Sequence, residues 1–271
     1  MKRFIYSICI VMLMVSCQKK KQVETLVVKS DSVQSQCDST LADSVPTPSK
    51  SADGLFDDFI YSFMRNARFQ TERIKFPLPC LTDGKDTPIA KSSWKFDPLY
   101  RHNDVYTLIF DNAHSIKAEK DTSLHHAVVE WVYLNKRRVK QYVFDKLDGQ
   151  WMLVEINNHD LSQNINNDFY DFYRQFSSNK KFQTKHILNP FHFKTYDFDN
   201  FRNIEGLLDV EQWPDYRPTL PSGTITNINY GQSYGNARRR VLMICSQSAG
   251  MGCSLTFVRQ GKTWMLEKLE N

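Results

Sequence analysis

Apolar side chains recur at helical spacing in two segments of the chain. In both segments they occupy positions i, i+3, i+4 and i+7, which form one face of an amphipathic helix. The positions are Phe56, Phe59, Ile60 and Phe63, then Phe169, Phe172, Tyr173 and Phe176. The pattern therefore predicts two helices, each with an aromatic stripe against a core.

Downstream of each helix the pattern changes to short apolar runs typical of strands. Asp148-Gly149 lies between two such runs and is a strong signal for a β-hairpin. The predicted strands are 105–110, 128–134, 139–146 and 151–156, followed by 224–230, 241–245, 253–259 and 263–269. A helix followed by an antiparallel meander predicts an α+β fold, with a curved antiparallel sheet around the helical stripe.

The second half of the chain repeats the first at an offset of 113 residues. The segments 56–78 and 169–191 align without a gap, and 144–153 recurs as 257–266. Shared residues include Phe69-Gln70-Thr71 with Phe182-Gln183-Thr184, and Trp151-Met152-Leu153 with Trp264-Met265-Leu266. A repeat of this length corresponds to a small domain rather than to a solenoid unit. We therefore predict two tandem α+β units, 54–158 and 168–271, connected through the polar segment 157–167.

The first residues resemble the signal of a bacterial lipoprotein. Lys2 and Arg3 precede an apolar run of residues 4–16, which is too short to span a bilayer comfortably. Small residues then lead to Cys17, as in a lipobox. The resemblance implies a signal peptide at 1–16 and a diacylglycerol on Cys17, which would anchor the mature protein to the membrane; the alternative is an ordinary signal peptide.

Residues 18–53, after Cys17, have the composition of a disordered tether. The segment has no aromatic residue, and its charges balance. Three Asp-Ser triplets resemble the Bacteroidetes O-glycosylation signal and predict modification at Ser32, Ser39 and Ser44, unless they reflect low complexity alone. Gln18 rather than Asp after the lipidated cysteine favours the outer membrane. The basic residues 19–21 differ from acidic surface-export signals, so we expect the periplasmic face.

Charge and cysteine content narrow the function classes. The net charge of +5 falls to +3 without Lys2 and Arg3, which does not suit a nucleic-acid-binding protein. The cysteines lack the CxxC spacing of a metal site, so we predict no metal. No phosphate loop or hydrolase motif is present either, and no cofactor is expected.

The order of elements, the aromatic first helix and the closing Gly-Gln-Trp hairpin at 149–151 resemble nuclear-transport-factor-2-like (NTF2-like) domains. In the second half Gly261 is shifted by one position relative to its Trp. With the lipobox, the tether and the FQTxxI motif, the chain is similar to an uncharacterised Bacteroidetes lipoprotein family with this cone-shaped fold. The resemblance covers residues 54–271. Because members of the wider superfamily often dimerise through their sheets, it implies that two tandem units could pack as a covalent pseudo-dimer.

Glu130 is the main candidate for catalysis. In a strand it shares a face with Val128 and Val132, and an acid among apolar neighbours could act as a general base. Met243 replaces it in the second half, so the fold does not require a charge there. The alternative is an ion pair between Glu130 and Lys140, which would lie diagonally across the hairpin if its register centred near Lys136.

The same register would place Cys245 opposite Cys253 and allow a cross-strand disulfide; the alternative is two thiols. The Gln-Thr pair present in both halves is interpreted as structural, because catalytic residues usually occur once.

We therefore expect a lipid-anchored envelope protein that binds a small ligand or another envelope protein without catalysis. The alternative is a small-molecule enzyme of isomerase, lyase or hydrolase type, with a pocket in the first unit and Glu130 as acid or base.

Overall fold

The computed structural model describes residues 53–271, except 233, 236 and 248–251. The predicted signal peptide, the lipidated Cys17, the tether and the glycosylation positions Ser32, Ser39 and Ser44 lie outside the described residues and stay predictions.

The two predicted helices are present, and each is followed by a second short helix. The helices are α1 (Phe56–Arg65), α2 (Ala67–Glu72), α3 (Asn167–Ser178), α4 (Lys180–Lys185) and α5 (Trp213–Tyr216). In each pair an asparagine ends the first helix and caps the second. The Asn66 side chain accepts a hydrogen bond from the amide of Phe69 at 3.0 Å, and that of Asn179 accepts one from Phe182 at 3.1 Å. Both helical stripes are buried, as predicted.

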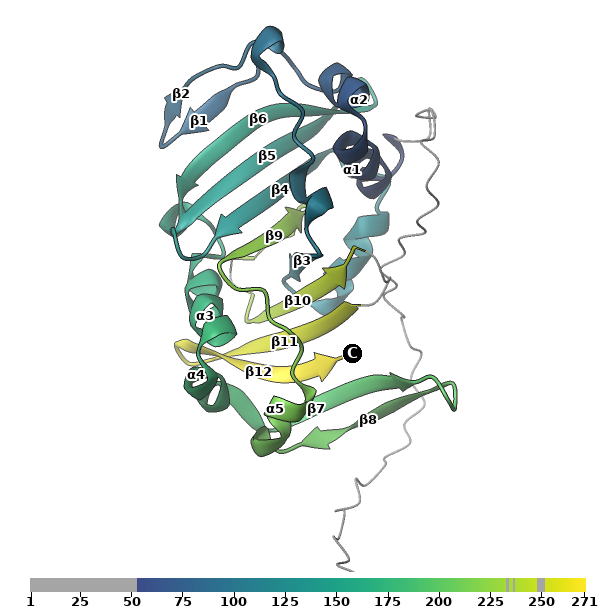
Figure 1. The fold of residues 1–271 in the computed structure, drawn as a ribbon, viewed down its shortest axis with the longest axis vertical. Coiled ribbons are helices and arrows are strands. Elements are labelled where there is room, and N and C mark those ends of the chain that lie inside the picture. The colour runs from purple at the N-terminus through teal and green to yellow at the C-terminus, as the bar shows by residue number, and fades with distance from the viewer. Residues whose placement is uncertain (1–52, 233, 236, 248–251) are drawn as a thin grey trace, which may run out of the picture.

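Two six-stranded sheets follow one another along the long axis of the molecule (Figure 1). The first has the order β2-β1-β6-β5-β4-β9 and the second the order β3-β10-β11-β12-β7-β8. The bounds in the first half are β1 (Cys80–Thr82), β2 (Lys85–Asp86), β3 (Val105–Phe110), β4 (His126–Tyr133), β5 (Arg138–Leu147) and β6 (Gln150–Asp160). Those in the second half are β7 (Ile187–Asp197), β8 (Arg202–Leu208), β9 (Thr224–Asn229), β10 (Arg239–Ser246), β11 (Gly252–Gln260) and β12 (Thr263–Glu270).

The sheets are mixed rather than antiparallel throughout, which corrects the prediction. β1 runs parallel to β6, and β7 runs parallel to β12. The reason is that the segment after each helix pair, β1 or β7, adds to the open edge of the meander and runs in the same direction as the outer strand, β6 or β12.

Short 3₁₀ helices occupy the connections. They are η2 (Lys91–Ser93), η3 (Leu99–His102), η4 (Ala113–Lys120), η5 (Leu161–Gln163) and η6 (Val210–Gln212). The predicted connection at 157–167 is shorter in the structure, because β6 continues to Asp160 and α3 begins at Asn167.

Each sheet is completed by a strand from the other half of the chain. β3 pairs with β10 of the second half, and β9 pairs with β4 of the first half. β9 is the edge strand of the first sheet and β3 that of the second, and the two strands contact one another where the sheets meet (Figure 1). The sequence predicted both strands but not this exchange.

The same aromatic arrangement recurs in the two cores. Phe56 of α1 contacts Phe144 and Trp151 edge-on, with ring centroids 5.4 and 5.0 Å apart. In the second core, Phe169 of α3 contacts Phe257 and Trp264 edge-on at 5.4 Å in both cases. The aromatic pairs retained by both halves therefore belong to the fold.

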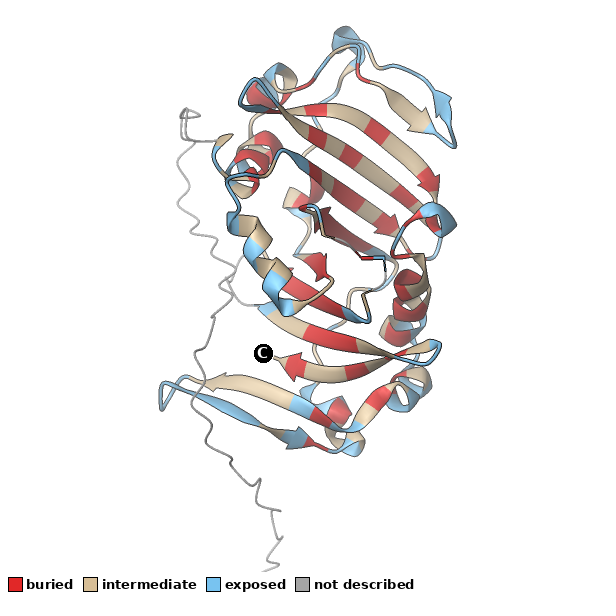
Figure 2. Cartoon of the chain, turned by 180° about the vertical axis from the view of Figure 1, so that it is seen from behind, coloured by how far each residue is buried: buried red, intermediate tan, exposed pale blue. Residues whose placement is uncertain are grey.

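β10 contributes to both cores because both of its faces are covered (Figure 2). Met243 and Cys245 pack in the first core, whereas Leu242 and Ile244 pack in the second. A central strand covered on both faces explains why 241–245 is apolar at every position.

Candidate functional site

Glu130 lies on β4 and is buried, with 4% of its surface exposed. Four neutral groups donate hydrogen bonds to its carboxylate, two to each oxygen. Oε1 accepts from Gln141 Nε2 and Asn164 Nδ2, both at 2.8 Å. Oε2 accepts from Asn227 Nδ2 at 3.0 Å and from the Tyr170 hydroxyl at 3.2 Å. The carboxylate thus joins β4 and β5 of the first half to α3 and β9 of the second.

Arg240 is the second buried charge of this region, with 2% of its surface exposed. Its Nε donates to Asn166 Oδ1 at 2.9 Å, and its remaining bonds go to backbone carbonyls, including that of Tyr234. Asn166 is linked in turn to Asn164, which is a partner of Glu130. The backbone amide of Asn166 donates a hydrogen bond to Asn164 Oδ1 at 2.8 Å. Two asparagines therefore bridge a buried acid and a buried base that do not touch, and their hydrogen bonds compensate the burial of both charges.

The expected ion pair between Glu130 and Lys140 is wrong. Lys140 Nζ lies 3.5 Å from Asp97, and Gln141 stands directly opposite Glu130. The turn between β4 and β5 has four residues, 134–137, with Arg137 in the left-handed region at φ 54°. An even number of turn residues shifts the register by one position from a hairpin centred on Lys136.

The corresponding shift in the second half separates Cys245 from Cys253. Cys253 pairs with Ile244, and Cys245 pairs with Gly252. Cys245 packs in the first core and Cys253 against the second, so their side chains leave opposite faces of the sheet. This register removes the geometric basis of the predicted disulfide, and both residues are thiols in the structure.

Asp57 on α1 is a candidate that the sequence reasoning missed. Its Oδ1 accepts a hydrogen bond from the Tyr230 hydroxyl at 2.8 Å, and its side chain remains partly exposed. Burial raises the pKa of Asp57 to about 6, opposed by the bond from Tyr230 and reinforced by the charge of Asp58. Burial, and then the charge of Asp57, also raises the pKa of the buried Tyr100 phenol. A carboxyl group with a pKa of about 6 that is bonded to a phenol can act as an acid or a base near neutral pH.

One signal in the sequence could have drawn attention to Asp57. It follows the first residue of the aromatic stripe, and the corresponding position of the second half is Tyr170. Like Glu130, which aligns with Met243, Asp57 is thus an acid in one half that the other half does not retain.

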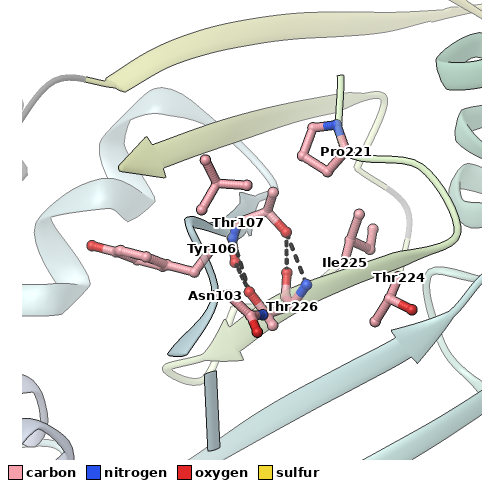
Figure 3. A pocket seen from close by; sticks show the side chains of 8 residues that line it. Asn103, Tyr106, Thr107, Pro221, Thr224, Ile225 and Thr226 are labelled. Carbon is pink, nitrogen blue, oxygen red and sulfur yellow. Dashed lines mark hydrogen bonds between the residues drawn. The ribbon is translucent and has the colours of Figure 1, made fainter. Parts of the chain in front are cut away.

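A small cavity lies where β3 and β9 cross (Figure 3). Its volume is about 30 Å³, and it is lined by Asn103, Val105, Tyr106, Thr107, Pro221, Thr224, Ile225 and Thr226. The volume corresponds to one water molecule, whereas ligand sites begin at about 300 Å³. The lining residues do not include Glu130, so this cavity offers that carboxylate no substrate.

Thr107 and Thr226 hold this crossing through reciprocal bonds (Figure 3). The amide of Thr107 donates to Thr226 Oγ1 at 2.8 Å, and the amide of Thr226 donates to Thr107 Oγ1 at 3.0 Å. Each hydroxyl also donates to the carbonyl of the other residue, at 2.5 and 3.0 Å. The pair therefore replaces ladder hydrogen bonds at the junction between the two sheets.

Gln70 and Gln183 are buried and bonded to backbone and tryptophan groups. Gln70 Nε2 donates to the carbonyls of Phe63 and Asp97, and its Oε1 accepts from Trp94 Nε1 at 3.1 Å. Gln183 makes the matching bonds to Phe176 and Trp213. These contacts are those of structural residues that satisfy buried groups.

Among the described residues, no three His, Cys, Asp or Glu side chains gather as a metal site would require. None of the described helices is long and apolar enough to cross a membrane.

The comparisons with known proteins agree with this architecture. A family model, described as a domain of unknown function (DUF4348), matches residues 33–271. The chain belongs to this family. The crystal structure of an NTF2-like protein from Bacteroides fragilis NCTC 9343 is 38% identical, with a TM-score of 0.74, and the match covers 83% of this chain and 98% of that one. The curated proteins contain no match. The expected uncharacterised family with an NTF2-like fold is therefore confirmed.

Proposed function

We propose that the chain is a lipid-anchored cell-envelope protein and a nonenzymatic module that binds a ligand or a protein. The observation that carries this proposal is the environment of the Glu130 side chain. Its carboxylate is buried and receives four neutral donors from both halves of the chain. Glu130, the main catalytic candidate from the sequence, thus connects the two halves of the chain through hydrogen bonds.

We further propose that the fold consists of two tandem NTF2-like units that form a covalent pseudo-dimer. The 113-residue offset and the matching strand orders of the two sheets support this proposal. The exchange of β3 and β9 and the threonine pair between them act as its interface.

The proposed location is the outer membrane, on its periplasmic face, with the lipid on Cys17. It rests on the residues around the lipobox and on the basic start of the tether. Replacing Cys17 with Ala should release the protein from the membrane fraction. Unchanged fractionation of Cys17→Ala would show that the chain is held by something other than this lipid.

The nonenzymatic part is tested by complementation in cells that lack the protein. We expect Glu130→Gln to restore the wild-type phenotype whenever immunoblots show wild-type abundance. A Glu130→Gln protein that is abundant, folded and unable to complement would support the catalytic alternative.

A second candidate function has an observation of its own. Asp57, with its pKa raised to about 6 and its bond to Tyr230, favours acid or base chemistry at the first core. If the chain is an enzyme, we assign the acid or base to Asp57 rather than to Glu130. In the same complementation experiment Asp57→Asn should then fail, whereas Asp58→Asn, which alters the exposed neighbouring acid, should succeed.

A further inference from the structure

The hairpin β7–β8 exposes two aromatic rings at its tip. The strands pair from Phe191 opposite Leu208 to Asp197 opposite Arg202, and the hairpin projects beyond the rest of its sheet (Figure 1). Phe198 is 71% exposed and Phe201 is 81% exposed, more than any other large apolar residue of the described chain. Folding buries little of either ring, so the fold alone does not account for them.

The backbone of the tip makes Phe201 more unusual. Its φ of 49° lies in the left-handed region, which disfavours a bulky side chain and favours glycine or asparagine. The shorter hairpin β1–β2 of the first half meets the same demand with Asp83 and Gly84. The second half thus has an exposed aromatic residue where its own turn geometry favours a small polar one.

The charges at the tip are largely compensated. Asp197 accepts hydrogen bonds from the amides of Asp199 and Asn200 and from Asn200 Nδ2, and its Oδ2 lies 3.5 Å from Arg202 Nε. Asp199 adds one exposed acid. With two acids and one base, the tip suits a zwitterionic surface better than a strongly anionic one.

The apolar area at the tip is too small for a stable protein interface. Two largely exposed phenylalanine rings offer roughly 300 Å², whereas a stable complex buries about 800 Å² on each partner. Ile204 and Leu207 on β8 are also exposed, but three and six residues of strand place them about 10 and 20 Å from Phe201. Shallow insertion into a bilayer needs no larger area, and aromatic rings favour the membrane interface.

We infer that the β7–β8 tip docks on a zwitterionic phospholipid surface by inserting Phe198 and Phe201. This contact would orient the molecule on the bilayer to which the lipid on Cys17 tethers it. The inference rests on the proposed membrane location, but its test omits Cys17, so failure of the lipid anchor and failure of the tip can be distinguished.

The test uses the chain from residue 18, which retains both cores, and vesicles of equal parts phosphatidylcholine and phosphatidylethanolamine. We expect the wild-type chain to sediment with the vesicles. Phe198→Ser with Phe201→Ser should weaken the partition at least about tenfold, since both apolar groups that would insert into the bilayer are lost. Ile165→Ser is the matched control. It removes an exposed apolar side chain outside the β7–β8 hairpin and should bind as the wild type does.

A second variant guards against misfolding. Phe198→Trp with Phe201→Trp keeps the aromatic surface and should bind at least as well as the wild type. The inference is overturned if the wild-type chain stays in the supernatant, or if the serine variant is folded by circular dichroism and binds equally well. It is also overturned if light scattering shows that the two rings instead join two copies of the chain.

Discussion

The two cores each bring one carboxyl group and one tyrosine together, but the acid lies on a different element in each. In the first core, the helical residue Asp57 accepts a hydrogen bond from Tyr230, which directly follows β9. In the second, the helix supplies the hydroxyl of Tyr170, and the acid is Glu130 on β4. The helical acid has one tyrosine donor and stays partly exposed, whereas the strand acid has four donors and is buried.

The difference shows which parts of the two similar halves are free to change. The aromatic framework is the same in both halves, because it fills equivalent space. The polar contacts differ, because each needs only a donor opposite an acceptor and not a particular residue at a particular position. Met243, which takes the position of Glu130, packs in the first core without a carboxylate.

The strongest way to break the comparison is to give both halves the same residue at this position. Glu130→Met should lower the free energy of unfolding by at least about 3 kcal/mol, because buried donors of Asn164, Asn227 and Tyr170 lose their acceptor. Urea denaturation measures the loss. Met243→Leu, which keeps volume in the first core, should cost less than about 1.5 kcal/mol. Equal losses in the two variants would mean that the network around Glu130 contributes nothing specific.

The joint between the cores should be the next most sensitive region. Thr107→Val or Thr226→Val keeps the shape but removes the hydroxyl from the reciprocal pair, and each should cost about 1–3 kcal/mol. The double variant should cost less than the sum of the two single variants, because both belong to one set of bonds. Thr87→Val, at an exposed position just after β2, is the control and should change stability by less than about 0.5 kcal/mol. Strict additivity would contradict the coupling seen in the structure.

The titration of Asp57 should distinguish the first core from the second. A folded-state pKa raised to about 6 from an ordinary value of 3.8 means that folding favours the protonated acid. The stabilisation is complete below about pH 4 and is lost as the pH rises through about 6, at a cost of at most about 3 kcal/mol.

Asp57→Asn should therefore remove most of the stability loss between pH 4 and pH 8, since its side chain stays neutral. Thermal unfolding at several pH values provides the measurement. Asp58→Asn should retain most of the wild-type pH dependence, because burial raises the pKa of Asp57 more than the charge of Asp58 does. An Asp57→Asn profile that parallels the wild type would place the titration elsewhere.

The smallest expected effect concerns the cysteines. Because Cys245 and Cys253 face different cores, a reducing agent should change the free energy of unfolding by less than about 0.5 kcal/mol. Mass spectrometry of alkylated, unreduced peptides should find both thiols labelled after denaturation. A peptide pair joined through the two residues would show that the strands adopt another register.

The local elements could be predicted from the sequence because they depend on local pattern. The stripe that begins at Phe56 fixed α1, and Asp148-Gly149 occupies the left-handed positions of the hairpin between β5 and β6, as predicted. The exchange of β3 and β9 could not be predicted, because alternating apolar residues identify a strand and not its neighbour. The register error at Glu130 has a similar origin, since turn length, rather than the strands, sets the pairing.

The candidate site was predicted only in part. Glu130 was recognised as an unusual acid, but its four partners come from segments up to 97 residues away in the chain. Asp57 was overlooked because an acid at the start of a helix is ordinary there, as it interacts well with the helix dipole. What sets Asp57 apart is its burial in the folded chain, which raises its pKa and which the local sequence does not show.

The crossing of β3 and β9 has a consequence for how the protein forms during synthesis. The first sheet lacks its last strand until residues 224–229 have left the ribosome, so the edge of β4 stays open while most of the chain is made. Open strand edges invite aggregation, and contacts between distant segments form slowly. We therefore expect a nascent chain that needs protection until about its final fifth emerges, and completion of both sheets in one late step.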